Sequence, residues 1–453
     1  MSPADVRRKG RTAPSGRRVV SSACRTWVAV VLCALMLAWA AGPALGAEYS
    51  VLHQFGGGAF DGAQPYGSLS VGGDGLLYGM TSAGGAYDRG TVFSYDPLSD
   101  SVNVLHSFAS GEPDGSLEGS ILSAGNGTLY GVTPFGGAND HGMIFEINNN
   151  GSFNQLYSFS GGDDQGSHPH YASLTRVGTT LYGTTAYGGE NGAGALFSYD
   201  TAGSAFNVLH EFGGSGDGCY PYGTPQWDGT ALHGMTCGGG ANGQGTIYRL
   251  DPGTAAYGVL YDLDSSSGTY PYGSLLLQDS VLYGMAAAGG ASGKGTVFKY
   301  DPVKDSLEVL HDFTGTQTDG ASPRGAVIYD GKLWGMTQAG GLYDDAGVLQ
   351  DAGTMFSLAT DGSGFDLIHS FGGTYDGYPD GADPWGSLVR DGATMYGMTQ
   401  YGGESNLGVL FRYGPEQGPG PEPVPEPATL VFFATGLAGA ISIARRTKPG
   451  RAG

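Results

Sequence analysis

The sequence predicts an all-β fold, a seven-bladed β-propeller that is closed by its own N-terminal strand. Two observations lead to this prediction. One short unit recurs seven times along the 453-residue chain, and each copy contains four strand-like segments separated by turn residues. Repeats of this size with four short strands each are typical of propeller blades. We also expect an N-terminal signal segment and a C-terminal transmembrane helix outside the propeller.

The repeat is easiest to follow through a Leu-Tyr-Gly motif, which first occurs at 77–79 and returns with small variations. Its glycines are 52, 52, 51, 50, 51 and 62 residues apart, and an insertion around 342–352 lengthens the last interval. In the first copy the strand-like segments are 66–69, 76–81, 90–96 and 103–108. Alternating side chains predict strands, and the Gly-Gly and Asp-Pro pairs between them predict turns.

The order of the strands within a blade follows from side-chain size. Strands nearest the propeller axis crowd together, so they need small residues. A small pair recurs in the first segment of every copy, so we place this segment innermost and the 103–108 type of segment outermost. The pairs are Gly67-Ser68, Gly119-Ser120, Ala172-Ser173, Gly223-Thr224, Gly273-Ser274, Gly325-Ala326 and Gly386-Ser387.

The two ends of the repeat region complement each other. An outer-type strand, 49–55, precedes the first copy, whereas the seventh copy ends with its third strand, 409–413. Pairing these segments would complete the seventh blade and remove two exposed strand edges. The propeller is therefore predicted to span residues 48–413.

Residues 1–47 have the layout of a secretory signal peptide. Several arginines precede an apolar stretch at 27–40, and small residues at 44–47 offer a cleavage site. An uncleaved membrane anchor is the alternative. Residues 48–413 then contain 10 Lys/Arg and 38 Asp/Glu. A body this acidic repels nucleic acid and anionic lipid, which leaves cations, basic proteins and neutral glycans as partners.

Two cysteines, Cys219 and Cys237, remain once the signal is removed. They lie in the same repeat, and an exported protein meets an oxidising compartment, so we expect a disulfide between them. Two free buried thiols are the alternative. We expect no metal site, because two cysteines need further ligands to hold zinc.

The repeat resembles the GloVer tandem repeat of bacterial surface proteins. Residues 77–97 and 282–302 are nearly full matches, and the Gly-Gly pair is present in all seven copies. The resemblance covers essentially all of 49–413, and it implies an exported, propeller-like protein with no settled biochemical activity. The fourth copy departs most, with His233 and the two cysteines at otherwise standard positions.

The C-terminal tail resembles the PEP-CTERM sorting signal handled by exosortases in Gram-negative bacteria. A Pro/Gly/Glu linker at 414–424 leads to Pro425, Glu426 and Pro427, then to the apolar run 428–444 and a basic cluster. The resemblance implies an exosortase-like processing partner, an inner-membrane-anchored precursor, and a final place on the cell envelope surface or in the extracellular matrix. The run just reaches the roughly 17 residues that a transmembrane segment needs. A permanent membrane anchor is the alternative.

Residues with catalytic potential are scarce. Five histidines recur at one register position two residues before Phe, which favours a packing role: His53, His106, His210, His311 and His369. The recurring Asp-Gly pairs before the inner strands favour turns: Asp61, Asp114, Asp217, Asp319 and Asp376. His141, His168 and His170 lie in turn regions and are too isolated in sequence to pair with a nucleophile. We expect no cofactor. Calcium is the alternative, but it needs six to eight oxygen ligands, which one Asp per blade does not supply without neighbours.

One set of positions predicts a ligand site. The residues just before the small inner pairs are Tyr66, Glu118, Tyr171, Tyr222, Tyr272, Arg324 and Trp385. If the inner strands line the axis, these side chains surround one mouth of the channel. Aromatic rings there would stack on sugar rings while polar groups fix hydroxyls. The alternative is that they pack between blades.

The sequence therefore predicts an exported, non-catalytic binding or scaffold propeller, with glycan or exopolysaccharide as the expected ligand. An enzyme acting on polysaccharide, a lyase or a glycosidase, is the alternative from another class; a glycosidase needs two acids roughly 5 to 9.5 Å apart. A structural spacer without a ligand is the third. The fold does not separate them, because function depends on the site that the fold carries.

Overall fold

The computed structural model describes residues 47–109, 117–162, 165–341 and 351–415. Within these ranges all regular elements are strands. Nothing in the described part of the chain forms a helix long and apolar enough to cross a membrane. The predicted signal peptide, the linker beyond Pro415, the segment 428–444, the motif Pro425–Pro427 and Asp114 all lie outside the described residues.

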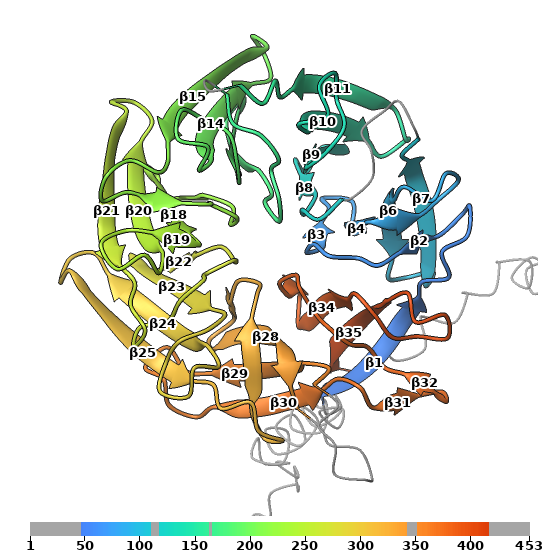
Figure 1. Cartoon of the computed structure of the whole chain (residues 1–453). Helices are drawn as coiled ribbons and strands as arrows, with labels where there is room; N and C mark the ends of the chain where they lie inside the picture. The colour runs from blue at the N-terminus through green and yellow to red at the C-terminus, as the bar shows by residue number, and fades with distance from the viewer. Residues whose placement is uncertain (1–46, 110–116, 163–164, 342–350, 416–453) are drawn as a thin grey trace, which may run out of the picture. The chain divides into compact units, whose positions relative to one another are not determined.

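Seven antiparallel sheets surround one axis, six of four strands and one of five, which confirms the predicted propeller (Figure 1). From the axis outward, blade 1 contains β3 (Ser70–Val71), β4 (Leu77–Thr81), β6 (Thr91–Asp96) and β7 (Ser101–Ser107). Blade 2 contains β8 (Leu122–Ser123), β9 (Thr128–Thr133), β10 (Met143–Asn148) and β11 (Phe153–Ser158). Blade 3 contains β12 (Thr175–Val177), β13 (Thr180–Thr185), β14 (Ala195–Asp200) and β15 (Ala205–Glu211).

The remaining blades follow the same order. Blade 4 contains β17 (Gln226–Trp227), β18 (Leu232–Thr236), β20 (Thr246–Asp251) and β21 (Ala256–Asp262), and blade 5 contains β22 (Leu276–Gln278), β23 (Val281–Ala286), β24 (Thr296–Asp301) and β25 (Ser306–Asp312). Blade 6 contains β27 (Ile328–Tyr329), β28 (Leu333–Gly340), β29 (Thr354–Leu358) and β30 (Asp366–Ser370), with β26 (Gly320–Pro323) beside β28. Blade 7 contains β33 (Val389–Asp391), β34 (Thr394–Thr399), β35 (Val409–Pro415) and β1 (Ala47–Gln54).

The N-terminal strand closes the ring, as predicted. β1 pairs with β35 as the outermost strand of blade 7 (Figure 1). The Phe55 N–H donates to the Gly408 carbonyl at 3.0 Å. Tyr49 of β1 also stacks on His369 of blade 6, with ring centroids 3.8 Å apart. The first strand of the propeller therefore stabilises both the seventh blade and its neighbour.

The small residue pairs surround the axis, which confirms the predicted order within a blade. The pairs directly precede the innermost strands, however: in blade 1 the strand begins at Ser70, not at Tyr66. A Cβ atom added to Gly67 would lie only 2.0 Å from the Gly119 carbonyl oxygen of the next blade. The Ser68 N–H donates to the Ser120 hydroxyl at 2.7 Å, and the Ser387 N–H donates to the Ser68 hydroxyl at 2.7 Å. Serine hydroxyls of one blade thus accept hydrogen bonds from backbone N–H groups of the next blade, where in a flat sheet backbone carbonyls would accept them.

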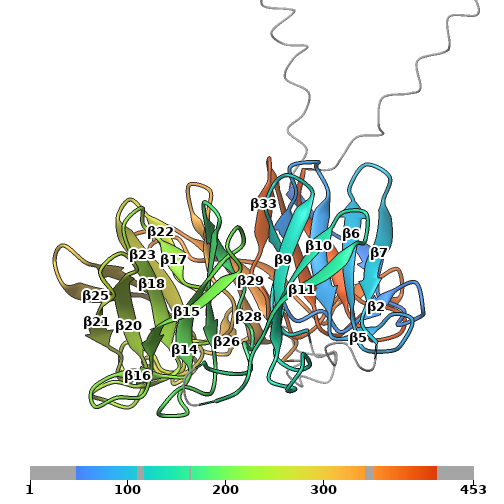
Figure 2. The same ribbon diagram turned by 90° about the horizontal axis from the view of Figure 1, so that it is seen from above.

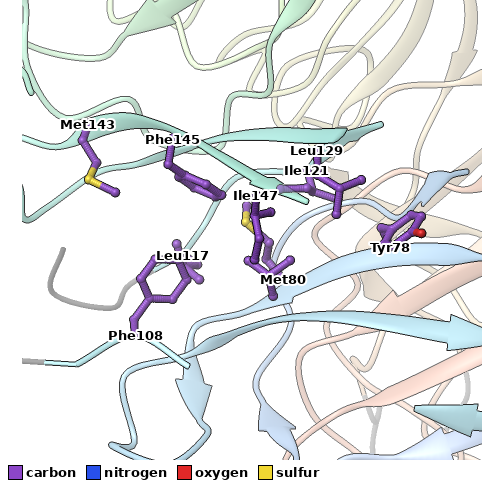
Figure 3. Close-up of a cluster of buried hydrophobic side chains, with 10 residues drawn as sticks. Tyr78, Met80, Phe108, Leu117, Ile121, Leu129, Met143, Phe145 and Ile147 are labelled. Carbon is purple, nitrogen blue, oxygen red and sulfur yellow. The ribbon is translucent and has the colours of Figure 1, made fainter. Parts of the chain in front are cut away.

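The hydrophobic core lies between adjacent blades. In the cluster shown in Figure 3, Tyr78 and Met80 of blade 1 pack with Leu129, Phe145 and Ile147 of blade 2. All five side chains are buried. Each blade is a sheet that buries both faces against its neighbours, so one of seven such clusters lies between each pair of adjacent blades.

The recurring outer-strand histidines pack against the next blade. His210 stacks on Tyr257, and His311 stacks on Phe365, with centroids 3.5 and 3.9 Å apart. The same histidines contact an Asp in the loop that follows, which the sequence did not predict: His210–Asp217 at 2.9 Å and His311–Asp319 at 3.0 Å.

In blade 6 the Asp partner differs from the one that the Asp-Gly pattern suggests. Asp380, not Asp376, lies 2.9 Å from His369. Asp376 instead stands between β31 (Thr374–Tyr375) and β32 (Tyr378–Pro379) with a φ of 51°. The loop contains a small extra hairpin, which moves the partner four residues along the chain.

The two faces of the propeller differ in their loops. One face, here the glycine-loop face, is formed by the Gly-Gly loops and by the loops that lead from one blade to the next. These loops pair in short ladders, β2 (Gly62–Ala63) with β5 (Ala83–Gly84) and β16 (Gly218–Cys219) with β19 (Gly238–Gly239). They lie at the lower side of Figure 2.

The opposite face, here the hairpin face, contains the tight turns between first and second and between third and fourth strands. β35 runs toward this face from its Gly402-Gly403 loop, and β1 runs away from it. Ala47 and Pro415 therefore both lie at the hairpin face, so the described chain begins and ends on the side opposite the glycine loops.

Candidate ligand site at the channel mouth

The seven predicted site residues meet around the axis at the glycine-loop face, and each is half-buried. Six of them line a cavity of about 250 Å³ on the axis. The hydroxyl-bearing residues Ser68, Ser120, Ser173 and Ser274 line the same cavity. Tyr222 does not line it; its ring lies between those of Tyr171 and Tyr272, with centroids 5.6 and 5.4 Å away. We call these seven residues the mouth ring.

Aromatic and cation contacts connect most of the mouth ring. Tyr66 meets Trp385 edge to face, with centroids 5.6 Å apart. The Arg324 guanidinium lies over both Tyr272 and Trp385, at 4.3 and 4.6 Å from the ring centroids. Such contacts each stabilise by roughly 0.5 to 2 kcal/mol. The ring is therefore held by contacts among its own members across the blades.

Tyr171 and Trp385 close the mouth across the axis. Their rings stack with centroids 5.3 Å apart and an interplanar angle of 20°, although they belong to blades 3 and 7. Tyr171 reaches so far because blade 3 has one extra residue: Pro169 is followed by both His170 and Tyr171 before the small pair, whereas Pro65 is followed by Tyr66 alone. Tyr171 has a φ of 55°, which is uncommon for a bulky residue. Counting from proline, His170 is the equivalent of Tyr66, whereas counting from the small pair Ala172-Ser173 gives Tyr171, the predicted residue.

Polar partners fix several members of the mouth ring. Glu118 lies 2.6 Å from His170 Nδ1, and the Arg324 Nε–H donates to Gln338 at 2.7 Å. The Gln400 amide donates to the Tyr66 hydroxyl at 2.5 Å. The pKa values of all four ring tyrosines are raised above the ordinary value, and burial is the largest cause in each case. Their hydroxyls therefore stay protonated and can donate hydrogen bonds to a ligand.

The three turn histidines, which are separated in sequence, come together beside Glu118. The His141 and His168 ring centroids are 5.3 Å apart, and those of His168 and His170 are 6.1 Å apart. The His168 N–H also donates to the His141 carbonyl at 2.9 Å. Burial, followed by the nearby His170 and His141, lowers the pKa of His168. No group of three or more His, Cys, Asp or Glu in the described ranges is arranged to hold a metal ion.

Cys219 and Cys237 are both free, so the expected disulfide is not formed in the structure. The two loops do lie on one face, because Cys219 pairs with Gly238 in the β16–β19 ladder. Cys237 itself lies between β18 and β19 and belongs to neither strand. Cys237 instead lies against the Tyr272 hydroxyl at the mouth ring, and Cys219 packs on the core between blades 3 and 4.

Three exposed tyrosines beside the mouth ring were missed by the sequence analysis. Tyr187, Tyr220 and Tyr270 are 39%, 39% and 47% exposed, and they come from the glycine-loop face of blades 3, 4 and 5. Tyr220 and Tyr270 directly precede Pro221 and Pro271, the prolines before the mouth-ring residues. The residue before this proline has a positive φ in six blades. A comparison of this residue across the repeats would have identified Tyr220 and Tyr270.

These features define a class of protein, a repeat propeller. Aromatic side chains close its axis at the glycine-loop face, and the first and last described residues lie at the hairpin face. The model of the Gloeobacter/Verrucomicrobia repeat matches residues 42–180 and 162–349, more than half of the chain. The chain belongs to this repeat family. The PEP-CTERM protein-sorting motif matches residues 423–446, which include Pro425–Pro427. The protein is thus an exported propeller with a membrane-anchored precursor, and the motif implies processing by an exosortase.

No curated protein sequence is significantly similar to the chain. Similar solved structures include the extracellular domain of the putative one-component system BT4673 from B. thetaiotaomicron, at 14% identity and a TM-score of 0.49. The match covers 79% of this chain and 40% of that one, so the chain spans about two fifths of its length.

Two further similar structures are enzymes by their descriptions. Oligogalacturonate lyase from Vibrio parahaemolyticus is 9% identical, with a TM-score of 0.48 and coverage of 82% of this chain and 97% of that one. The GH74 enzyme of Niastella koreensis is 16% identical, with a TM-score of 0.49 and coverage of 70% and 46%. At these identities the likeness concerns the propeller fold alone.

Proposed function

We propose that the protein is a non-catalytic surface or matrix protein that binds glycan or exopolysaccharide at the glycine-loop face. The observation that carries the proposal is the concentration of half-buried aromatic side chains around a cavity lined by hydroxyls at the propeller axis. Aromatic rings with a few convergent polar groups are what carbohydrate binding requires. The mouth-ring residues Trp385 and Tyr222 are the side chains that we expect to matter most.

The placement of the chain ends supports this choice of face. Ala47 and Pro415 both lie at the hairpin face, so the sorting tail joins the propeller there. The glycine-loop face is then free of the chain's own attachment points. A precursor held by its tail would present the mouth ring away from the membrane, toward polymers of the envelope or matrix.

A glycan array probed with the purified protein, with and without calcium, tests the proposal. We expect binding of one or more oligosaccharides, and we expect it to be lost in Trp385→Ala and Tyr222→Ala. Since both rings also pack on neighbours, thermal unfolding must be measured alongside, and Trp385→Phe keeps a ring at the site. Absence of binding to every glycan would leave the spacer function. Calcium dependence would overturn the expectation of no cofactor.

A polysaccharide-acting enzyme is the second candidate, and two acids near Tyr66 favour it. Glu118 is paired with His170, whereas burial raises the pKa of Asp383 despite the nearby Arg324 guanidinium. Acids in contrasting environments can serve as base and acid in glycoside hydrolysis. Incubation with polysaccharides and detection of new reducing ends tests this, with Glu118→Gln and Asp383→Asn as the matched variants. Turnover that both variants abolish would replace the binding proposal.

The final location is also part of the proposal. We expect exosortase processing to remove the segment 428–444 and release the protein to the cell surface or the matrix. Mass spectrometry of the C-terminal peptide from wild type and a Glu426→Ala variant measures this step. An intact tail in the surface fraction would indicate a permanent anchor instead.

A further inference from the structure

We infer that Tyr187, Tyr220 and Tyr270 form a platform for a neutral polysaccharide chain, which lies across blades 3 to 5 beside the mouth ring. This inference rests on the proposed glycan-binding function and names its ligand class and a second set of contacts. We call these three residues the tyrosine arc.

The tyrosine arc is continuous with the mouth ring. Tyr187 meets Tyr220 edge to face, with centroids 5.6 Å apart, and its hydroxyl lies 3.3 Å from that of Tyr222. Tyr220 and Tyr270 are each two residues before a mouth-ring tyrosine. A chain that contacts the mouth ring at Tyr222 therefore meets exposed tyrosines on the same and the next blade, and successive sugars can stack on successive rings.

The backbone holds the arc in place. Tyr220 and Tyr270 have φ values of 59° and 57°, a conformation that a bulky residue keeps only when its surroundings impose it. The Tyr220 N–H donates to the Ala193 carbonyl of blade 3 at 2.8 Å, and the Cys237 N–H donates to the Tyr220 carbonyl at 3.0 Å. Preorganised aromatic side chains lose little conformational entropy on binding. At the same position, blades 1, 6 and 7 carry Gln64, Ser322 and Asp383.

The charge around the arc selects the ligand class. The glycine-face loops of blades 3 to 5 (186–194, 212–222, 237–245, 262–272 and 287–295) contain Glu190, Asp217, Asp262, Asp264 and one cation, Lys294. Their other polar side chains are uncharged, among them Asn191, Asn242, Gln244 and Thr269. The Arg324 guanidinium of the mouth ring also lies beside the arc, 4.3 Å from the Tyr272 ring centroid, which makes four acids and two cations. A polyanion such as a polyuronate therefore meets a net negative surface here. Uncharged sugars can stack on the rings and hydrogen-bond to amides and hydroxyls.

Calorimetric titration of the full chain with cellohexaose, xylohexaose, mannohexaose and hexagalacturonate tests the inference. We expect at least one neutral hexaose to bind more tightly than hexagalacturonate, and Tyr220→Ala and Tyr270→Ala each to weaken it by about tenfold, as for buried aromatic contacts. Tyr87→Ala is the matched control. Tyr87 is 61% exposed in the Gly-Gly loop of blade 1, on the same face but outside the arc, so its removal should leave the affinity unchanged.

The outcomes separate this inference from the proposed function. If a neutral hexaose binds and the arc variants keep its affinity while Trp385→Ala loses it, the arc is wrong and the proposed function stands. If hexagalacturonate binds more tightly than every neutral hexaose, the ligand class is wrong. If none of the four binds, the inference is overturned, whereas the proposed function is overturned only if the glycan array also shows no binding. A loss in Tyr87→Ala equal to that in Tyr220→Ala would also contradict the arc.

Discussion

Closure of the ring by β1 can be tested at one side chain. Tyr49 stacks on His369 of blade 6, and its hydroxyl donates to the Asp380 carbonyl at 2.6 Å. It also packs against Phe411 of β35, with ring centroids 5.3 Å apart. Replacing Tyr49 with Ala removes the contacts that connect the N-terminal strand to two blades at once.

The expected magnitude follows from those contacts. Truncating a fully buried aromatic side chain costs about 3 to 5 kcal/mol. Tyr49 is only partly buried, so we expect the lower part of that range, about 3 kcal/mol in the free energy of unfolding. Tyr49→Phe keeps the stacking and removes only the hydroxyl, which should cost about 1 kcal/mol. The difference between the two variants isolates the ring contacts.

Urea unfolding of the purified chain, followed by fluorescence, measures both variants. A double-mutant cycle with His369→Ala should give a coupling of about 0.5 to 1.5 kcal/mol, because the two rings are in direct contact. Tyr87→Ala, which removes an exposed ring, should change stability by less than about 0.5 kcal/mol. A Tyr49→Ala cost below that of Tyr87→Ala, or no coupling to His369, would refute closure by β1.

Three further predictions concern the axis, the His–Asp pairs and the thiols. Gly67→Ala should lower the free energy of unfolding by more than about 2 kcal/mol, because its Cβ would lie 2.0 Å from the Gly119 carbonyl oxygen. Gly58→Ala is the control: a Cβ there has no atom within 4 Å, so the same unfolding assay should show little change. Burial opposes ionisation of Asp217, but the His210, Tyr257 and Gly218 hydrogen bonds outweigh it and lower its pKa. This carboxylate should therefore stabilise the fold above the unfolded pKa of about 3.9 and lose that contribution as the pH falls below it. The melting temperature of Asp217→Asn should decline less steeply with falling pH than that of the wild type, and an equally steep decline would contradict this. Both thiols should react with Ellman's reagent after denaturation without reductant, and Cys237, whose pKa burial raises to about 11, should react more slowly than Cys219 in the native protein. A protein without free thiols would show that the disulfide does form.

Much of the fold could be predicted because each structural requirement recurs seven times. A single Gly-Ser pair is weak evidence for an inner strand, but seven pairs at equal spacing identify one crowded position. The two strands left without a partner, 49–55 and 409–413, then predicted how the ring closes. Contacts between repeats were harder to predict. His210 and Asp217 were read as separate packing and turn residues, and only the fold shows that the loop returns the Asp to the histidine.

The candidate site was harder to predict because it depends on departures from the repeat. One extra residue after Pro169 moves Tyr171 across the axis, and counting backward from the small pair conceals that insertion. The tyrosine arc was missed because it lies one position before proline, outside the segment chosen as the inner strand. The disulfide was expected because the two cysteines share one repeat, but their relative placement depends on a two-residue ladder that the sequence does not reveal.

The departures from the repeat make the glycine-loop face of the propeller asymmetric. Positions that hold the blades together vary little: small residues surround the axis, and Phe or Leu follows each outer strand. The position before proline has the same backbone conformation in six blades but carries Tyr in two adjacent ones and Gln, His, Ser or Asp in the others. Packing cannot explain this difference, since Tyr220 and Tyr270 are partly exposed while their backbone contacts match those of the other blades. This asymmetric set of exposed tyrosines in a symmetric fold is the observation on which the proposed binding of an extended ligand rests. That asymmetry is what a binding function requires and what a spacer does not.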